Sequence, residues 1–333
     1  MEYYGLDIHK LSITYTCMGT EGQVLRRGRV PNTAEGIREI VAPSGGEAWV
    51  ALEATRAWSF VYDTLEPTGV RIFLAHARRV KAIASAKVKT DSVDSETLAH
   101  LLRTGLLPVS YAPPPSIRSW REMLRTRHAL VRMRTTFYCR IQILLAKEGL
   151  LCPATDIFGR RGRRWLQAQE LSLVHRQLVN LLVRQADALK DEISVLEDNL
   201  REALSDQPAV ARLLTVPGFG FLTAATFLAE VGNVSRFPRA RHLVSYLGLA
   251  PRVHASGGRV RMGRLTKEGP PLVRSYLVQA AYNAVRRPGI CQDLYQRVYT
   301  RSGSQAARVA VARKLVILAF LAWKHGVQVP SRE

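Results

Sequence analysis

The first third of the chain combines apolar residues that alternate with a period of two and amphipathic stretches with helical spacing. Residues 2–8 form a short apolar run. In residues 11–17 apolar side chains alternate with serine and threonine, as in a half-buried strand. A glycine-containing turn at 19–22 precedes another strand-like run over 23–30. The pattern therefore predicts three consecutive strands joined by short turns.

The segments that follow alternate between helix and strand. Asn32 or Thr33 can cap a helix over 33–42, and a mostly apolar run over 47–53 predicts a strand. A helix over 58–66, a strand over 70–75 and a helix with Asp91, Asp94, Leu98, Leu101 and Leu102 complete the pattern. This is the element order of the ribonuclease-H fold, so an α/β domain is expected over residues 1–112.

Four acidic residues occupy matching places in this predicted domain. Asp7 lies near the end of the first strand and Glu53 ends the fourth, while Asp91 and Asp94 share one face of the last helix because they are three residues apart. Clustered carboxylates suit Mg²⁺ or Mn²⁺ better than zinc, and two such ions can stabilise an in-line phosphoryl displacement. We predict that the four residues hold Mg²⁺ or Mn²⁺; ordinary surface or capping acids are the alternative.

The middle of the chain, residues 113–205, is predicted to be a helical coiled-coil hairpin. Three prolines precede an arginine-rich helix over 116–149, and a helix over about 165–204 has apolar residues three, four and seven apart. A loop over 152–164 lies between them. We interpret the hairpin as a dimerising arm that contacts nucleic-acid backbone through charge, with ordinary helix packing in one subunit as the alternative. The candidate contacts are Arg121, Arg125, Arg132, Arg160, Arg161, Arg163 and Arg164.

The last section, residues 206–333, is predicted to be mainly α-helical. The Val-Pro-Gly-Phe-Gly stretch resembles a helix-hairpin-helix motif, in which Gly218 and Gly220 let backbone amides approach a phosphate. A tight turn between packed helices is the alternative.

A glycine-rich loop further on holds Ser256 among basic residues. Their guanidinium groups could stabilise a pentavalent phosphorus, but a serine hydroxyl needs a base or metal to become a nucleophile. An ordinary loop serine is therefore the alternative. The basic neighbours are Arg252, Arg259, Arg261, Arg264 and Lys267.

Composition indicates a nucleic-acid partner. The formal net charge of +21 exceeds what solubility requires, and 47% hydrophobic residues argue against a purely architectural basic protein.

The four cysteines form no Cys-x-x-Cys pair and no nucleotide-binding phosphate loop occurs, so neither a zinc site nor ATP hydrolysis is indicated. The apolar run over 315–323 is too short to span a bilayer and predicts a core helix. With no signal peptide, we expect a cytoplasmic protein that has no membrane partner and associates with the nucleoid when bound to DNA.

Taken together, these motifs resemble the IS110 family of transposases, also called DEDD recombinases. The matching stretches are Gly-Leu-Asp-Ile-His-Lys, Leu-Glu-Ala-Thr, Lys-Thr-Asp-Ser-Val-Asp-Ser, Val-Pro-Gly-Phe-Gly and Tyr-Leu-Gly-Leu-Ala-Pro-Arg with Ser-Gly downstream. The resemblance implies a RuvC-like N-terminal domain with Asp7, Glu53, Asp91 and Asp94 as its metal quartet. It also implies a coiled coil, and a C-terminal transposase domain with Ser256 as nucleophile. Arg56-Ala57-Trp58 departs from the Gly-x-Tyr that members often carry after Glu-Ala-Thr.

The resemblance further implies a structured non-coding bridge RNA whose loops pair with donor and target DNA, so that base pairing selects the sequence. It implies homodimers that pair into a tetramer on DNA, and active sites that combine the acids of one subunit with the serine of another. The predicted function is therefore an RNA-guided recombinase that cuts and rejoins DNA through a phosphoserine. The alternatives are a RuvC-like endonuclease that uses metal-activated water and a non-catalytic nucleic-acid-binding protein.

Overall fold

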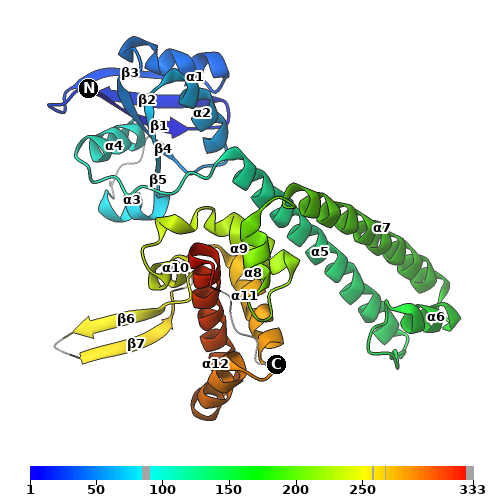
Figure 1. Cartoon of the computed structure of the whole chain (residues 1–333). Helices are drawn as coiled ribbons and strands as arrows, with labels where there is room; N and C mark the ends of the chain where they lie inside the picture. The colour runs from blue at the N-terminus through cyan, green and yellow to red at the C-terminus, as the bar shows by residue number, and fades with distance from the viewer. Residues whose placement is uncertain (85–90, 257–258, 267, 328–333) are drawn as a thin grey trace. The chain divides into compact units, whose positions relative to one another are not determined.

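The computed structural model describes residues 1–84, 91–256, 259–266 and 268–327, without the side chains of residues 253–262 and 264. The chain divides into two compact units, Met1–Ala112 and Pro113–Glu333 (Figure 1). The first is a mixed α/β unit and the second is mostly helical, which confirms the predicted fold class at that level.

The first unit is built on a five-stranded sheet with the order β3-β2-β1-β4-β5. The first three strands are antiparallel neighbours, whereas β4 and β5 continue the sheet in parallel with β1. All five strands were predicted, with ends that differ by at most one residue, and the sheet is consistent with a ribonuclease-H-like domain. The strands are β1 (Glu2–Ile8), β2 (Ser12–Met18), β3 (Val24–Pro31), β4 (Ala48–Glu53) and β5 (Arg71–Ala75).

Helices cover both faces of this sheet. Tyr4, Leu6 and Ile8 of β1 belong to the core formed with α1 (Ala34–Val41) and α2 (Trp58–Leu65). Side chains alternate along a strand, so the intervening residues of β1 face the opposite side, where α4 (Asp91–Arg103) contacts the sheet. The sequence did not predict the helix α3 (Ala77–Ile83), whose Val80 joins the α4-side core. Short 3₁₀ turns at Ala42–Ser44 and Glu66–Thr68 follow α1 and α2.

Close contact with the sheet fixes the position of α4. A Cβ atom on Gly5 would lie 2.0 Å from the carbonyl oxygen of Ser95 and 2.5 Å from the amide nitrogen of Ala99. Only glycine therefore permits this approach of backbone to backbone. The hydroxyls of Thr16 and Ser95 are 2.9 Å apart and buried, which adds a hydrogen bond between β2 and the helix.

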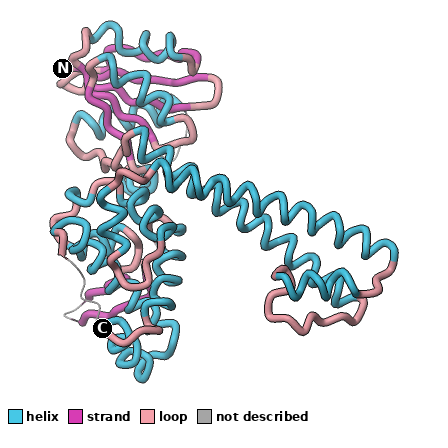
Figure 2. Tube along the Cα trace, turned by 45° about the vertical axis from the view of Figure 1, so that its right-hand side comes forward, coloured by secondary structure: helices cyan, strands magenta, loops and turns pink. Residues whose placement is uncertain are grey.

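The second unit begins with a helical hairpin, in which α5 (Pro115–Lys147) and α7 (Leu173–Ala203) lie side by side (Figure 2). Buried residues recur every seventh position along α7, at Val179, Ala186, Ile193 and Leu200. This is the spacing of a coiled-coil seam. Leu178, one of the apolar residues with this spacing in the sequence, is 40% exposed and lies outside the buried set.

Two predicted boundaries in the hairpin were wrong. The basic cluster expected in a loop begins a helix, α6 (Arg160–Ala168), and the second long helix begins at Leu173, not near 165. The side chain of Ser172 accepts a hydrogen bond from the amide of His175, and Glu148 binds both residues. This cap starts a new helix and separates it from α6.

The remaining elements form one helical core with a protruding two-stranded ribbon. The predicted core helix over 315–323 lies in α12 (Ile290–His325), where Leu315, Val316 and Phe320 are buried. Leu124 of α5 and Leu200 of α7 join the same core, so the base of the hairpin packs with the C-terminal helices. No helix in the described part of the chain is long and apolar enough to cross a membrane. The elements are α8 (Pro208–Leu214), α9 (Phe221–Val231), a 3₁₀ turn (Val234–Arg236), α10 (Ala240–Tyr246), β6 (Pro251–Ser256), β7 (Arg259–Leu265), α11 (Pro271–Ala284) and α12 (Ile290–His325).

Candidate functional site

Two of the predicted acids lie at the carboxyl-terminal ends of neighbouring parallel strands, Asp7 as the last residue but one of β1 and Glu53 as the last of β4. Leu6 of β1 pairs with Leu52 of β4, and Asp7 and Glu53 are the next residues of the two strands. Leu6 and Leu52 both belong to the core on the α1 and α2 side. Because side chains alternate, Asp7 and Glu53 lie on the opposite face of the sheet, which α4 covers.

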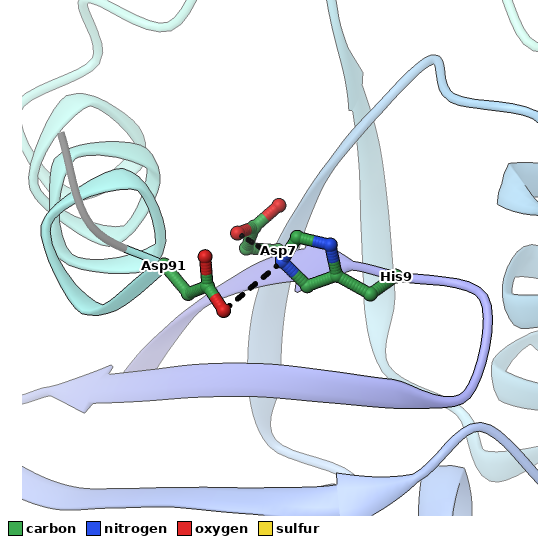
Figure 3. A group of neighbouring side chains, drawn as sticks. All are labelled: Asp7, His9 and Asp91. Carbon is green, nitrogen blue, oxygen red and sulfur yellow. Dashed lines mark hydrogen bonds and ion pairs between the residues drawn. The ribbon is translucent and has the colours of Figure 1, made fainter.

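The first turn of α4 supplies the other two acids. Asp91 begins the helix and Asp94 follows almost one turn later. Figure 3 shows the carboxylates of Asp7 and Asp91 near each other, with the imidazole of His9 beside them and one ring nitrogen directed toward both. His9 Nε2 lies 3.1 Å from Asp7 Oδ2 and 3.2 Å from Asp91 Oδ2, and one ligand atom of each residue lies within 4.8 Å of the others. The three residues therefore form a candidate metal centre.

His9 was not among the site residues predicted from the sequence. It lies one residue beyond the end of β1, where the alternation of the strand cannot be assumed to continue. Its position two residues after Asp7 in the Asp-Ile-His-Lys stretch is the signal that could have identified it.

The acidic side chains of this cluster lie close enough to repel one another when ionised. The side chain of Asp7 is only 16% exposed, whereas that of Asp91 is 47% exposed. Burial is the main cause that raises the pKa of Asp7; His9 opposes the rise, and the nearby carboxylates of Asp91 and Asp94 add to it. A divalent cation would relieve this repulsion, and a set of carboxylate oxygens with one imidazole nitrogen fits such an ion.

Comparison with known proteins gives this geometry a context. Residues 4–148 match the family model of IS110-type DEDD transposases, which is described as "Transposase". Residues 210–296 match the model described as "Transposase IS116/IS110/IS902 family". The chain belongs to the IS110 family of transposases. The resemblance seen in its motifs is thereby confirmed.

Several transposases resemble the chain over most of its length. A putative transposase of Sinorhizobium fredii, y4qE, is 26% identical over 307 residues, which are 91% of this chain and 76% of that protein. The transposase for insertion sequence element IS1328 of Yersinia enterocolitica is 24% identical over 97% of this chain and 96% of its own length. That for IS1111A of Coxiella burnetii is 25% identical over 93% and 86%. The protein is thus a transposase of the insertion-sequence class, a DNA-processing enzyme for which the DEDD family suggests divalent metal use.

Some arginines of this IS110-family transposase that were predicted to contact nucleic acid are bound within the chain. Arg121 donates hydrogen bonds to the backbone oxygens of Ala229 and Glu230, and Arg125 pairs with the Glu230 carboxylate at 3.3 Å. Arg163 forms an ion pair with Asp187. The side chains of the others in the described part are exposed, at Arg132, Arg160, Arg161, Arg164 and Arg252.

The two glycines of the predicted helix-hairpin-helix differ in their surroundings. Gly218 has a φ of 78°, and a Cβ atom on it would lie 2.2 Å from the carbonyl oxygen of Ala280 in α11. Gly218 therefore serves the packing of the turn between α8 and α9. Gly220 is exposed at the N-terminus of α9, and no atom lies within 4 Å of the position that a Cβ atom on it would take. Phosphate binding at this turn remains a prediction.

Ser256 ends β6, in a segment that was predicted to be a loop. Instead, β6 and β7 form an antiparallel ribbon in which Ser256 pairs with Arg259. Alternating Arg-Val-Arg-Met residues from 259 onward suit a strand, and this periodicity was not recognised. The side chains of Ser256, Arg259, Arg261 and Arg264 lie outside the described part of the structure, as does all of Lys267, so their roles remain predictions.

Proposed function

We propose that this transposase cuts and rejoins donor and target DNA through a covalent phosphoserine at Ser256, with Mg²⁺ or Mn²⁺ held by Asp7, Glu53, Asp91 and Asp94. The observation that carries the proposal is the convergence of Asp7 and Asp91 on His9 within a domain that matches the DEDD transposases. Two acids at adjacent strand ends and two in the first turn of a packed helix can supply a four-carboxylate site on one face of the sheet.

The residues of the cluster have distinct roles in this proposal. Asp7 and Glu53 are the fixed half, because the strand ladder holds their backbones. Asp91 and Asp94 are the half that depends on the position of α4, and His9 adds a nitrogen ligand. When bound, a divalent cation would polarise the scissile phosphate and favour ionisation of an attacking hydroxyl.

In the proposed serine step, the energy of the broken DNA phosphodiester is kept in the phosphoserine bond. The Ser256 oxygen attacks the phosphorus and loses its proton, one phosphorus–oxygen bond of the DNA breaks, and a free DNA hydroxyl leaves. A hydroxyl from the partner DNA strand then attacks the phosphoserine and releases the serine, which accepts a proton again. One phosphodiester is broken and one formed, so the sequence of steps requires no nucleotide hydrolysis.

The family resemblance supports an RNA-guided assembly. In this proposal a bridge RNA pairs with donor and target DNA, while the protein binds backbone without reading bases. The net charge of +21 and the exposed arginines of α5 and α6 agree with that role. Dimers that pair into a tetramer would combine the acids of one subunit with the Ser256 of another, and the α5–α7 hairpin is the proposed dimerising arm.

A metal-dependent endonuclease is the second candidate function. It needs the cluster around Asp7 and Asp91 and no serine nucleophile, because a water molecule would attack the phosphate. The acid cluster supports both candidates equally, so the experiment must separate serine attack from hydrolysis.

The test is a reaction with Mg²⁺, RNA transcribed from the flank of the element and labelled donor and target DNA, run on a denaturing protein gel. Wild-type protein should form a protein–DNA adduct that Ser256→Ala abolishes and that the exposed-serine control Ser302→Ala retains. Asp7→Asn should abolish the adduct, whereas Asp63→Asn, an exposed position on α2, should not. Cleavage that persists in Ser256→Ala without any adduct would instead establish the endonuclease.

A further inference from the structure

The edge strand β3 presents two arginines on the same face as the acid cluster. Thr16 faces α4, because its hydroxyl contacts Ser95, and Thr14 is two residues away on the same strand. Their partners across the β2–β3 ladder are Arg27 and Arg29. Directly opposite residues share a face of the sheet, so both arginines lie on the α4 side.

The register aligns one of these arginines with the metal centre. Asp7 pairs with Thr14, and Thr14 pairs with Arg29, so the three residues form a row across β1, β2 and β3. Neighbouring strands are about 4.8 Å apart, which places the backbone of Arg29 roughly 10 Å from that of Asp7. The charge along this row therefore changes from negative at Asp7 to positive at Arg29. An extended arginine side chain can span most of the distance between them.

An open hollow connects the arginines to the acids. Its lining includes Thr14, Arg27 and Arg29 from the strands and Asp91 and Ser92 from the start of α4. Asp91 belongs both to this hollow and to the cluster with Asp7 and His9. A chain that enters the hollow along β3 therefore reaches the metal centre.

The present partners of the two arginines are easily exchanged. Arg27 pairs with Glu96 of α4, but their side chains are 47% and 39% exposed, and such a pair contributes only about 0–1 kcal/mol. Arg29 donates its Nε hydrogen to the hydroxyl of Ser12 at 2.9 Å. A phosphate can replace either partner, because guanidinium binds it through two parallel charge-assisted hydrogen bonds.

The neighbouring arginine shows the contrast. Arg26 lies on the opposite face, where it donates hydrogen bonds to Glu2 and to the hydroxyl of the buried Tyr4. That network ties β3 to β1 and leaves Arg26 a structural residue. The alternation along β3 therefore separates one arginine that stabilises the sheet from two that face the hollow.

We propose that Arg27 and Arg29 bind phosphate groups of the DNA strand that is cut, next to the scissile phosphate at the Asp7–Asp91 cluster. The inference rests on the proposed function, in which this cluster is the site of cleavage. Two residues apart on a strand, the arginines are about 7 Å from each other and can contact separate phosphates. A polyanion suits this surface for two reasons. Its phosphate next to the acids would be neutralised by the metal ion, and its phosphates beside β3 would meet the positive charges of the arginines.

The test compares two double variants of the full chain by fluorescence anisotropy with a labelled mixed-sequence DNA duplex, in EDTA and over a range of KCl concentrations. Arg27→Gln with Arg29→Gln should reduce the slope of log K against log salt by about 1.8, since each lost phosphate contact removes about 0.9. The matched control, Arg38→Gln with Arg71→Gln, removes the same charge from exposed positions on α1 and on the opposite edge strand. Its slope should stay within about 0.3 of wild type.

Further measurements separate this inference from the proposed function. The Arg27 and Arg29 variant should bind Mn²⁺ like wild type in a calorimetric titration, and Asp7→Asn should lose Mn²⁺ but keep its DNA affinity in EDTA. Absence of Mn²⁺ binding in wild type would refute the metal site while leaving the arginine result intact. Equal slopes for the two double variants, or a loss confined to an RNA probe of the same sequence, would overturn the DNA assignment.

Discussion

Replacing Gly5 with alanine tests whether the position of α4 controls the metal centre. The new Cβ atom would lie 2.0 Å from the carbonyl oxygen of Ser95 and 2.5 Å from the amide nitrogen of Ala99, whereas ordinary contacts begin at 3.4 Å. Both neighbours are backbone atoms of the helix, so no side chain can rotate to make room. The helix or the strand must therefore move by more than an ångström.

The cost of Gly5→Ala follows from that displacement. Overpacking of a close contact costs about 1–3 kcal/mol, and the double backbone clash argues for the upper value. Loss of the buried Thr16–Ser95 hydrogen bond adds about 1 kcal/mol. Alanine also lowers the conformational entropy of the unfolded chain, which offsets about 0.5–1 kcal/mol of this loss of stability. The net loss is about 3 kcal/mol, which for a domain of this size lowers the melting temperature by roughly 12 °C.

The same substitution should weaken metal binding although it changes no ligand. Asp91 and Asp94 move with the first turn of α4, and a metal site requires its ligands within about 0.5 Å of their places. We expect Mn²⁺ affinity to fall at least tenfold by titration calorimetry, with stability followed by scanning calorimetry. Gly220→Ala is the control, since its φ is −105° and no atom lies within 4 Å of the added carbon. Wild-type melting and Mn²⁺ affinity in Gly5→Ala would refute the reasoning.

Three further substitutions test packing and charge. Thr16→Val removes one partner of the buried Ser95 hydroxyl and should lower the free energy of unfolding by about 1–2 kcal/mol in urea titrations. Glu230→Gln removes the negative charge that faces the arginine partners of a side chain only 6% exposed. It should lower the free energy of unfolding by about 3 kcal/mol in the same titrations. The control Glu122→Gln changes a side chain that is 75% exposed and should lower it by less than about 0.5 kcal/mol. Burial raises the pKa of Asp7, so this carboxyl should contribute a loss of stability to the metal-free protein as pH rises from 3.8 through the raised pKa. Thermal melts should therefore show Asp7→Asn gaining stability relative to wild type over that range.

Each of these expectations has an outcome that contradicts it. Unchanged stability of Thr16→Val would mean that the hydroxyl pair does not hold α4 to β2. Equal costs for the two glutamine variants would show that burial does not strengthen the Glu230 contacts. A metal-free Asp7→Asn protein that is less stable than wild type above the titration range would mean that the Asp7 carboxylate is favourable in the folded state.

Local patterns predicted the first domain well because its strands follow simple rules. Alternation identified β2, the apolar run over 47–53 identified β4, and the turn at 19–22 separated the second strand from the third. The start of α7 could not be predicted in the same way. Its cap at Ser172 depends on Glu148, which is 24 residues earlier in the chain. An interaction of that kind exists only after the hairpin has formed.

The candidate site shows the same division. Asp7, Glu53 and the two acids of α4 could be proposed from the sequence because their places follow from strand ends and helical spacing. Arg27 and Arg29 could not be proposed in this way, because their relation to Asp7 depends on the register of two antiparallel ladders. A shift of one residue in either ladder would turn both arginines to the other face.

In the proposed site, metal binding and the packing of α4 must be linked. The strand ladder fixes Asp7 without the helix, but Asp91 reaches the site only when α4 is docked on Gly5. Thermodynamic linkage then requires the metal to stabilise the docked helix as much as docking strengthens metal binding. At an Mn²⁺ concentration about 100 times its Kd, wild type should gain about 2.7 kcal/mol. Gly5→Ala should recover part of its lost stability at saturating Mn²⁺, whereas Asp7→Asn should gain nothing. Equal Mn²⁺ stabilisation of wild type and Asp7→Asn would place the bound ion elsewhere.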